Sequence, residues 1–168
     1  MLDPLPDAAR LWLFALDGTP APRAVEAALA DVRAFLPSWA SHGRPVEARA
    51  DVLEGRVLAV GAVISADEMN AGVSGCGIDA MQHAVEAALA RHGLALAPAL
   101  AVTYEGDAGW TVAPRPAVRA RFKSGAADGA TPVLDLTHET VGALRADGLA
   151  RPAAETWAGR AFRLGAAA

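Results

Sequence analysis

The spacing of hydrophobic positions predicts a strand and then a long helix at the start of the chain. An apolar run at residues 10–16 ends in turn-forming residues, as expected for a buried strand. From Pro22 to Gly43, apolar residues recur at steps of three and four, which indicates a helix that buries Trp39 in its apolar stripe. Pro37 lies inside this helix, and we expect a kink or a restart there because proline removes a backbone donor.

The following region predicts a hairpin and then a second helix. Residues 46–52 alternate between apolar and polar, residues 54–55 form a turn, and residues 56–64 are apolar almost throughout, as in a central strand. A loop rich in small residues comes next. Apolar residues then recur with helical spacing over residues 78–89, and Gly93 is expected to end that helix in a left-handed conformation.

The second half of the chain predicts shorter elements. Residues 99–114 indicate another hairpin, residues 118–122 a strand, and residues 131–136 a last strand. A short helix follows, and we expect Thr137 to cap its start and Gly148 to close it.

Taken in order, these elements predict an α+β fold, in which a mainly antiparallel sheet has helices packed on one face around a ferredoxin-like core. The length fits a single α+β domain over residues 1–168. Two aromatic residues of the tail, Trp157 and Phe162, are expected to pack back onto the body.

Composition and charge narrow the classes of function. Hydrophobic residues make up 53% of the chain and charged residues 20%, yet no apolar run is long enough for a membrane span, so we expect a folded, soluble protein. The first residues lack the basic leader of a signal peptide, which predicts a cytoplasmic location. A net charge of -4 argues against nucleic acid as a partner, and the basic cluster at residues 115–123 is interpreted as a solvated strand face. The oligomeric state stays open.

One stretch concentrates residues that are capable of chemistry. Residues 74–83 read SGCGIDAMQH and contain the single cysteine, Cys76, at the start of a predicted helix. The positive end of the helix macrodipole stabilises a thiolate at such a position. Helical geometry places Asp79 and His83 four residues apart, on the side opposite the buried stripe. A thiol nucleophile also needs a base, and His42 and His83 are the candidates by residue type.

Each of these residues also has a purely structural interpretation. Cys76 can fill a gap as a small apolar residue, and Asp79 with His83 can form an exposed contact one turn apart. His42 and Gly43 are typical of a helix C-terminal cap.

The glycines around this helix start allow a further interpretation. Gly72, Gly75 and Gly77 resemble a phosphate cradle, but the spacing is not that of a P-loop or of a dinucleotide-binding loop. Ser74 can cap the helix without any ligand. The spacing C-x-x-D-x-x-x-H is no familiar zinc pattern, so the sequence predicts neither a metal nor a cofactor.

Three short motifs carry a resemblance. WASHG at residues 39–43, SGCGID at residues 74–79 and the ending ETWAGRAF together resemble a family of small uncharacterised bacterial proteins often labelled "ABC transporter ATPase". The family pattern has serine where this chain has Gly77. The resemblance implies no established activity, and ATP hydrolysis is not expected because a Walker A lysine is missing. The motif positions that it marks are Trp39, His42, Gly43, Ser74, Gly75, Cys76, Ile78 and Asp79.

Two functions from different classes follow. The first is a binding or accessory module, in which the expected helix end at residues 39–43 and the loop at residues 74–79 form a small polar site for a small molecule, an anion or a protein. The alternative is a thiol-dependent enzyme with Cys76 as nucleophile and His42 as base. We favour the first, because nothing in the sequence brings these two side chains within hydrogen-bond reach. The binding residues that it predicts are Trp39, Gly43, Ser74, Gly75, Gly77, Asp79 and His83.

Overall fold

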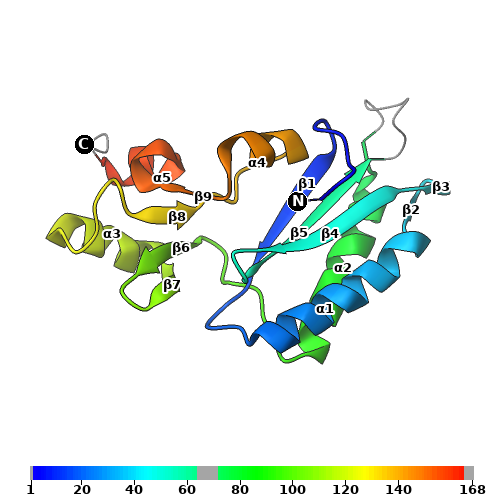
Figure 1. Ribbon diagram of the computed structural model, residues 1–168, viewed down its shortest axis with the longest axis horizontal. Coiled ribbons are helices and arrows are strands. Elements are labelled where there is room, and N and C mark those ends of the chain that lie inside the picture. The colour runs from blue at the N-terminus through cyan, green and yellow to red at the C-terminus, as the bar shows by residue number, and fades with distance from the viewer. Residues whose placement is uncertain (1, 64–71, 165–168) are drawn as a thin grey trace.

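The computed structural model describes residues 2–63 and 72–164, which contain two larger antiparallel sheets and a two-stranded hairpin (Figure 1). Ile64 and most of the small-residue loop predicted after it lie outside the described residues. The first sheet has the strand order β1-β5-β4. Because β5 lies in the centre of this sheet, all seven of its residues are buried, as its apolar sequence predicts. The three strands are β1 (Arg10–Ala15), β4 (Glu47–Leu53) and β5 (Val57–Val63).

Two long helices cover one face of this sheet, namely α1 (Pro22–Phe35) and α2 (Gly75–Arg91). The predicted long first helix is shorter than expected. It ends at Phe35, and Pro37 lies in a 3-10 turn, Leu36–Ser38, which is the break that the proline was expected to cause. The chain then turns into the hairpin β2 (Ala40–Ser41) and β3 (Arg44–Pro45) and does not continue as a helix to Gly43.

The first half of the chain has a ferredoxin-like order with its last strand reduced. The elements β1, α1, β4, β5 and α2 follow one another, and both neighbours of β5 pair with it antiparallel. A fourth strand would pair with the outer edge of β1. That edge holds two isolated bridges instead, Arg10 to Thr140 and Leu16 to Leu96. Beside the second bridge, Ala97 N–H donates to the Ala15 carbonyl over 2.8 Å.

The other face of the first sheet is covered as well. Helix α4 (Val141–Asp147) and the first residues of the chain pack there, so helices lie on both faces and not on one (Figure 1). Gly61 of β5 permits the close approach, because a Cβ at this position would stand 2.8 Å from Leu5 Cδ1 and 3.1 Å from Val141 Cγ2.

The cap of α4 differs from the sequence prediction by one short turn. Thr140, and not Thr137, caps the helix, because its Oγ1 accepts the Ala143 N–H over 3.1 Å. The Thr137 hydroxyl instead donates to Asp135 Oδ1 over 2.6 Å. Gly148 ends the helix, as predicted.

The second sheet has the strand order β7-β6-β8-β9 and its own small core. Helices α3 (Arg115–Ser124) and α5 (Trp157–Phe162) pack on it, and the rings of Phe122 and Phe162 stack with centroids 5.5 Å apart. Trp157 and Phe162 therefore pack back onto the body as expected. The strands are β6 (Ala101–Gly106), β7 (Gly109–Pro114), β8 (Pro132–Leu134) and β9 (Ala150–Pro152).

Helix α3 replaces the strand that was predicted at residues 118–122. Proline in its first turn and left-handed Gly125 after its last turn are start and stop signals of a helix. Val118 and Phe122, one turn apart, pack inward, whereas Arg119 and Lys123 are exposed. Arg121, between them, is half-buried, and its guanidinium carbon lies 5.5 Å from the centre of the Tyr104 ring. The charges predicted to share the outer face of a strand therefore lie on different sides of a helix.

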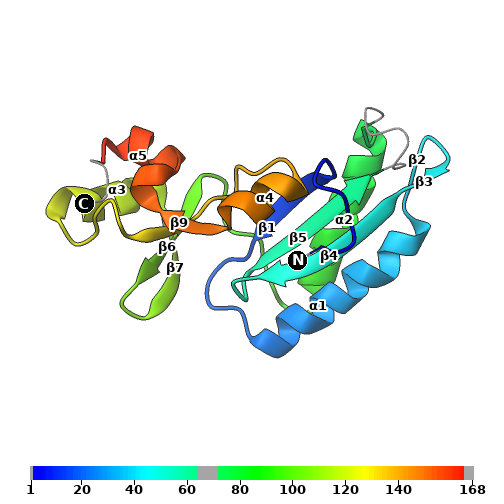
Figure 2. The ribbon, with the colours of Figure 1, turned by 45° about the horizontal axis from the view of Figure 1, so that its top comes forward.

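The two sheets lie side by side and give the molecule an elongated outline, with the first sheet and its helices at one end (Figure 2). The chain crosses to the second sheet after α2, returns to the first sheet before α4, and crosses back after α4, where β9 pairs with β8. Within residues 2–63 and 72–164, no helix has the length and apolar character that crossing a membrane requires.

Candidate functional site

The two motifs singled out in the sequence lie against each other. Trp39, which is 2% exposed, donates its indole N–H to the carbonyl of Gly77 in the first turn of α2, over 2.8 Å. The Trp12 and Phe35 rings pack around the same indole, with centroids 6.0 and 6.2 Å away. A buried indole needs a partner for its N–H, and here the second motif supplies it.

Two serines join the motifs beside this indole. The Ser74 N–H donates to Ser41 Oγ over 2.9 Å, and the Ser41 hydroxyl donates to Ser74 Oγ, also over 2.9 Å. Ser74 Oγ accepts the Gly77 N–H over 3.2 Å as well, so Ser74 caps α2. We call the four residues Trp39, Ser41, Ser74 and Gly77 the motif contact.

The motif contact leaves no room at Gly77. A Cβ at this position would stand 3.0 Å from Val73 Cγ1, 3.3 Å from Ser74 Oγ and 3.5 Å from Ser41 Cβ. A Cβ at Gly75, two residues earlier, would have nothing within 4 Å. The glycine at position 77 is therefore explained by packing against its neighbours.

His42 and Gly43 form the turn of the β2–β3 hairpin and do not cap a helix. Both have left-handed backbones, with φ of 51° and 76°, which is the pattern of a two-residue type I′ turn. Both residues are exposed. The C-terminal cap interpretation of His42 is wrong because the preceding helix ends before Trp39.

The other predicted site residues lie on the outer side of α2. Gly75, Cys76, Asp79 and His83 are all exposed, so Cys76 does not fill an apolar gap. Within the described part of the chain, no hydrogen bond joins Cys76 to His42, and Asp79 and His83 form no ion pair. The thiol-dependent enzyme stays a prediction.

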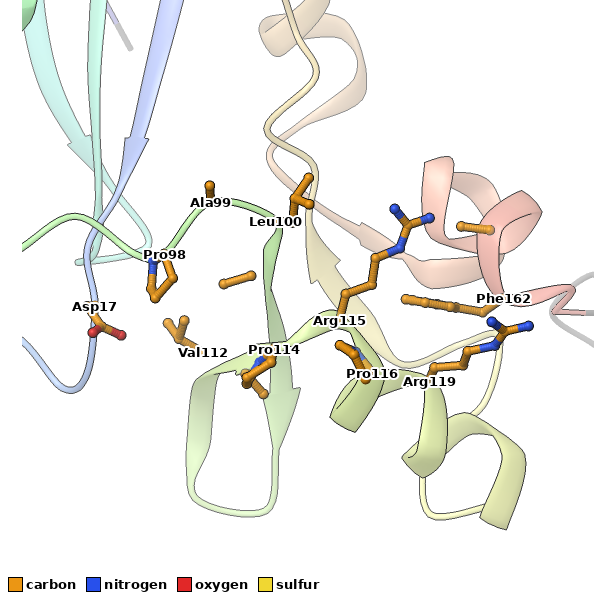
Figure 3. Close-up of a pocket in the computed structure, with 13 residues that line it drawn as sticks. Asp17, Pro98, Ala99, Leu100, Val112, Pro114, Arg115, Pro116, Arg119 and Phe162 are labelled. Carbon is orange, nitrogen blue, oxygen red and sulfur yellow. The ribbon is translucent and has the colours of Figure 1, made fainter.

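A pocket that the sequence did not indicate lies between the two sheets, beside β6 and β7. Its volume is about 580 Å³. Its walls come from the crossing segment that leads into β6, from the end of β7 and from the start of α3, and they are mostly apolar (Figure 3). We call it the apolar pocket, and it is lined by Asp17, residues 98–101, residues 112–116, Arg119, Ala161 and Phe162.

Leu100 stands on the wall of the apolar pocket in an unusual state. Its side chain is 77% exposed, which singles it out among the large hydrophobic residues of the described chain. Its φ of 65° is left-handed, where a leucine is strained. Neither exposure nor this backbone favours leucine for stability, so both point to a use of the side chain.

Charges stand at both ends of the apolar pocket. Arg115 and Arg119 reach from α3 toward Phe162, whereas Asp17 lies at the opposite end (Figure 3). The Arg115 guanidinium carbon is 5.1 Å from the centre of the Trp157 ring and 5.8 Å from that of Phe162. These cation–π contacts hold the guanidinium in place.

Arg56 connects the first sheet to the strand that lines the apolar pocket. This side chain is 4% exposed and lies in the turn between β4 and β5. Its guanidinium donates to the carbonyl of Trp110 on β7 over 2.7 Å, and to the carbonyls of Leu16 and Gly18 after β1. Burial lowers the pKa of Arg56, and the Asp17 carboxylate opposes that effect.

The sequence did not reveal the apolar pocket for two reasons. The walls of the pocket come from segments far apart in the chain, and its two arginines belong to the basic cluster that was interpreted as a solvated strand face. A usable signal existed, because Arg115 and Arg119 stand four residues apart just after Pro114, with Pro116 between them, which is helix-start spacing.

Neither a cluster of metal ligands nor a known relative marks the described part of the chain. In the described residues, no three side chains of His, Cys, Asp or Glu gather closely enough to hold a metal ion. No family model, no curated protein and no solved structure matches the chain. The resemblance to a bacterial family therefore stays a prediction from its three motifs.

Proposed function

We propose that this chain is a non-catalytic binding module whose ligand enters the apolar pocket. The observation that carries the proposal is Leu100, a strained and exposed leucine on the wall of a mostly apolar cavity. Strained backbone persists where function requires it, and pockets between structural units are frequent ligand sites. A volume of about 580 Å³ suits a small molecule.

The motif contact has a structural role in this proposal. The indole N–H of Trp39 and the Ser41 hydroxyl donate their hydrogen bonds within the contact, and Ser74 Oγ accepts two bonds there. A polar cluster satisfied in this way fixes the β2–β3 hairpin to the start of α2. The predicted polar site at these residues would need its ligand to bind at the exposed neighbours, His42 and Cys76.

A fluorescence titration with the neutral apolar dye 1-aminoanthracene tests the proposal. The wild-type protein is expected to bind one dye molecule. The Leu100→Asn variant should bind the dye about five-fold more weakly or worse, because the apolar contact of the leucine side chain with the dye is lost. Asparagine tolerates a left-handed backbone, so this variant should keep its fold.

Glu54→Asn is the matched control. Glu54 also has a left-handed backbone, with φ of 49°, but it lies in the β4–β5 turn outside the apolar pocket. The Glu54→Asn protein should bind the dye with the affinity of the wild type. Absence of binding to the wild type, or equal binding to Leu100→Asn, would contradict the proposal.

A further inference from the structure

We propose that the ligand of the apolar pocket is a small amphipathic anion, with its charged group at Arg115 and Arg119 and its apolar body along Leu100 and the end of β7. This inference rests on the proposed binding function. It adds the chemical class of the ligand and the direction in which the ligand lies.

Two cations line the apolar pocket at one end. Arg115 and Arg119 are exposed, stand one turn apart on α3 and line the same pocket. Among residues 2–63 and 72–164, no carboxylate forms an ion pair with either of them. Like charges at this spacing disfavour a helix, and cations are disfavoured in its first turn. A bound anion would remove both penalties.

Arg115 is oriented before any ligand arrives. Its cation–π contacts with Trp157 and Phe162 restrict the guanidinium but use none of its hydrogen-bond donors. The planar fork of a guanidinium matches the two oxygens of a carboxylate or a phosphate. Because the side chain is already ordered, binding costs less conformational entropy.

The pocket is polar at its ends and apolar between them. Asp17 stands at the end opposite the arginines and repels an anion from that side (Figure 3). The walls between the two ends are apolar and include Leu100, Val112 and Pro114. An amphipathic anion matches this arrangement in one direction only, with its oxygens at α3.

Titration calorimetry tests the inference with octanoate and octyl phosphate below their micellar concentrations, and with octanol below its solubility limit. The three ligands share one apolar chain, so a difference between them reports the anionic group. We expect at least one of the two anions to bind the wild type about ten-fold more tightly than octanol. The tighter of the two identifies the carboxylate or the phosphate as the group that is recognised.

Variants of the two arginines show where the anionic group of the ligand binds. Arg115→Gln and Arg119→Gln should each weaken anion binding about five-fold and leave octanol binding unchanged, since the apolar walls are intact. Lys123→Gln, on the same helix but outside the pocket, is the control and should change neither. Unchanged octanol binding also shows that Arg115→Gln keeps a folded pocket, although it removes two ring contacts.

The outcomes separate the two proposals. Equal affinities of the wild type for octanol and for both anions would overturn the amphipathic anion while leaving the apolar pocket as a binding site. Failure of all three ligands together with 1-aminoanthracene would overturn the binding function itself. Loss of octanol and anion binding alike in Arg119→Gln would also contradict an anion-specific role for that arginine.

Discussion

The motif contact and the apolar pocket differ in whether their chemistry is already satisfied. In the motif contact, the indole of Trp39 and the hydroxyl of Ser41 have hydrogen-bond partners, and Gly77 is in tight contact with its neighbours. In the apolar pocket, Leu100 is exposed and strained, and two arginines have no ion-pair partner among the described residues. Distinctive residues in a sequence can serve either packing or binding, and unsatisfied groups indicate binding.

The largest effect is expected when the motif contact loses its indole. Trp39→Ala should lower the free energy of unfolding by about 4 kcal/mol, because it leaves a cavity and unpairs the Gly77 carbonyl. Chemical denaturation measures this loss. Dye binding by the protein that remains folded should not change, since the apolar pocket is untouched.

Trp12→Ala is the comparison for that variant. The Trp12 ring touches Trp39 edge-on, but Trp12 is only partly buried. Trp12→Ala should therefore lower the free energy of unfolding clearly less than Trp39→Ala does. Equal costs would show that the indole hydrogen bond and its burial do not set the motif contact apart.

The second-largest effect is expected at Arg56, which joins the first sheet to β7 beside the apolar pocket. Arg56→Gln should lower the free energy of unfolding by about 3 kcal/mol, because three carbonyls lose their charged donor and the contact with the Leu16 carbonyl is buried. It should also weaken dye binding, since Arg56 holds β7 at the pocket wall. Arg23→Gln, at an exposed position of α1, is the control.

Circular dichroism and tryptophan fluorescence, followed together during unfolding, also test the prediction of one domain. Coincident transitions in the wild type would support a single cooperative unit over the chain. In Arg56→Gln, separated transitions would show that this side chain couples the two sheets. An Arg56→Gln protein as stable as the wild type would contradict the role given to this arginine.

A smaller effect distinguishes two glycines of the same helix start. Gly75→Ala should raise the free energy of unfolding slightly, because alanine favours a helix and the space is open. Gly77→Ala should be less stable than Gly75→Ala by about 1 kcal/mol, because its methyl group would press on Val73. Thermal unfolding of the pair measures the difference. A Gly77→Ala protein as stable as Gly75→Ala would show that the motif contact is loosely packed.

The smallest effect on stability is expected at Asp31, which lies outside both the motif contact and the apolar pocket. Asp31 pairs with His92 over 2.9 Å and accepts a hydrogen bond from Arg91 over 2.5 Å. These two contacts lower the pKa of Asp31 below its ordinary value of 3.8, and the contact with His92 has the larger effect. A lowered pKa contributes stability above pH 3.8, and that contribution disappears as the pH falls through the pKa of the folded protein.

Asp31→Asn should therefore be slightly less stable than the wild type at neutral pH, and the difference should shrink in acid. Thermal unfolding over a pH series measures it, and dye binding should stay unchanged. A difference that grows as the pH falls would contradict the pairing.

The parts of the fold that the sequence predicted are those set by local pattern. The period of apolar residues identified β1, the β4–β5 hairpin and α2, and Ser74 was recognised as a cap because its hydrogen bond is made within its own turn. Helix α3 was mistaken for a strand because the charges at Arg119, Arg121 and Lys123 alternate with apolar residues, as on the outer face of a strand.

The candidate site was harder to predict because it depends on contacts between distant segments. The contact of Trp39 with Gly77 spans 38 positions, and no local pattern encodes it. The apolar pocket joins residues on the β1–α1 turn, β7, α3 and α5, so it exists only after the two sheets have come together. The strain at Leu100 is a backbone property that a leucine in a sequence does not reveal.

The most direct test measures stability and dye affinity on two variants, Trp39→Phe and Leu100→Asn. Trp39→Phe keeps a ring but loses the hydrogen bond to Gly77, so it should lose about 2 kcal/mol of stability and retain wild-type affinity for 1-aminoanthracene. Leu100→Asn should retain its stability and lose affinity about five-fold or more. The reverse pattern, with weakened binding in Trp39→Phe and unchanged binding in Leu100→Asn, would contradict the assignment of structure to one region and binding to the other.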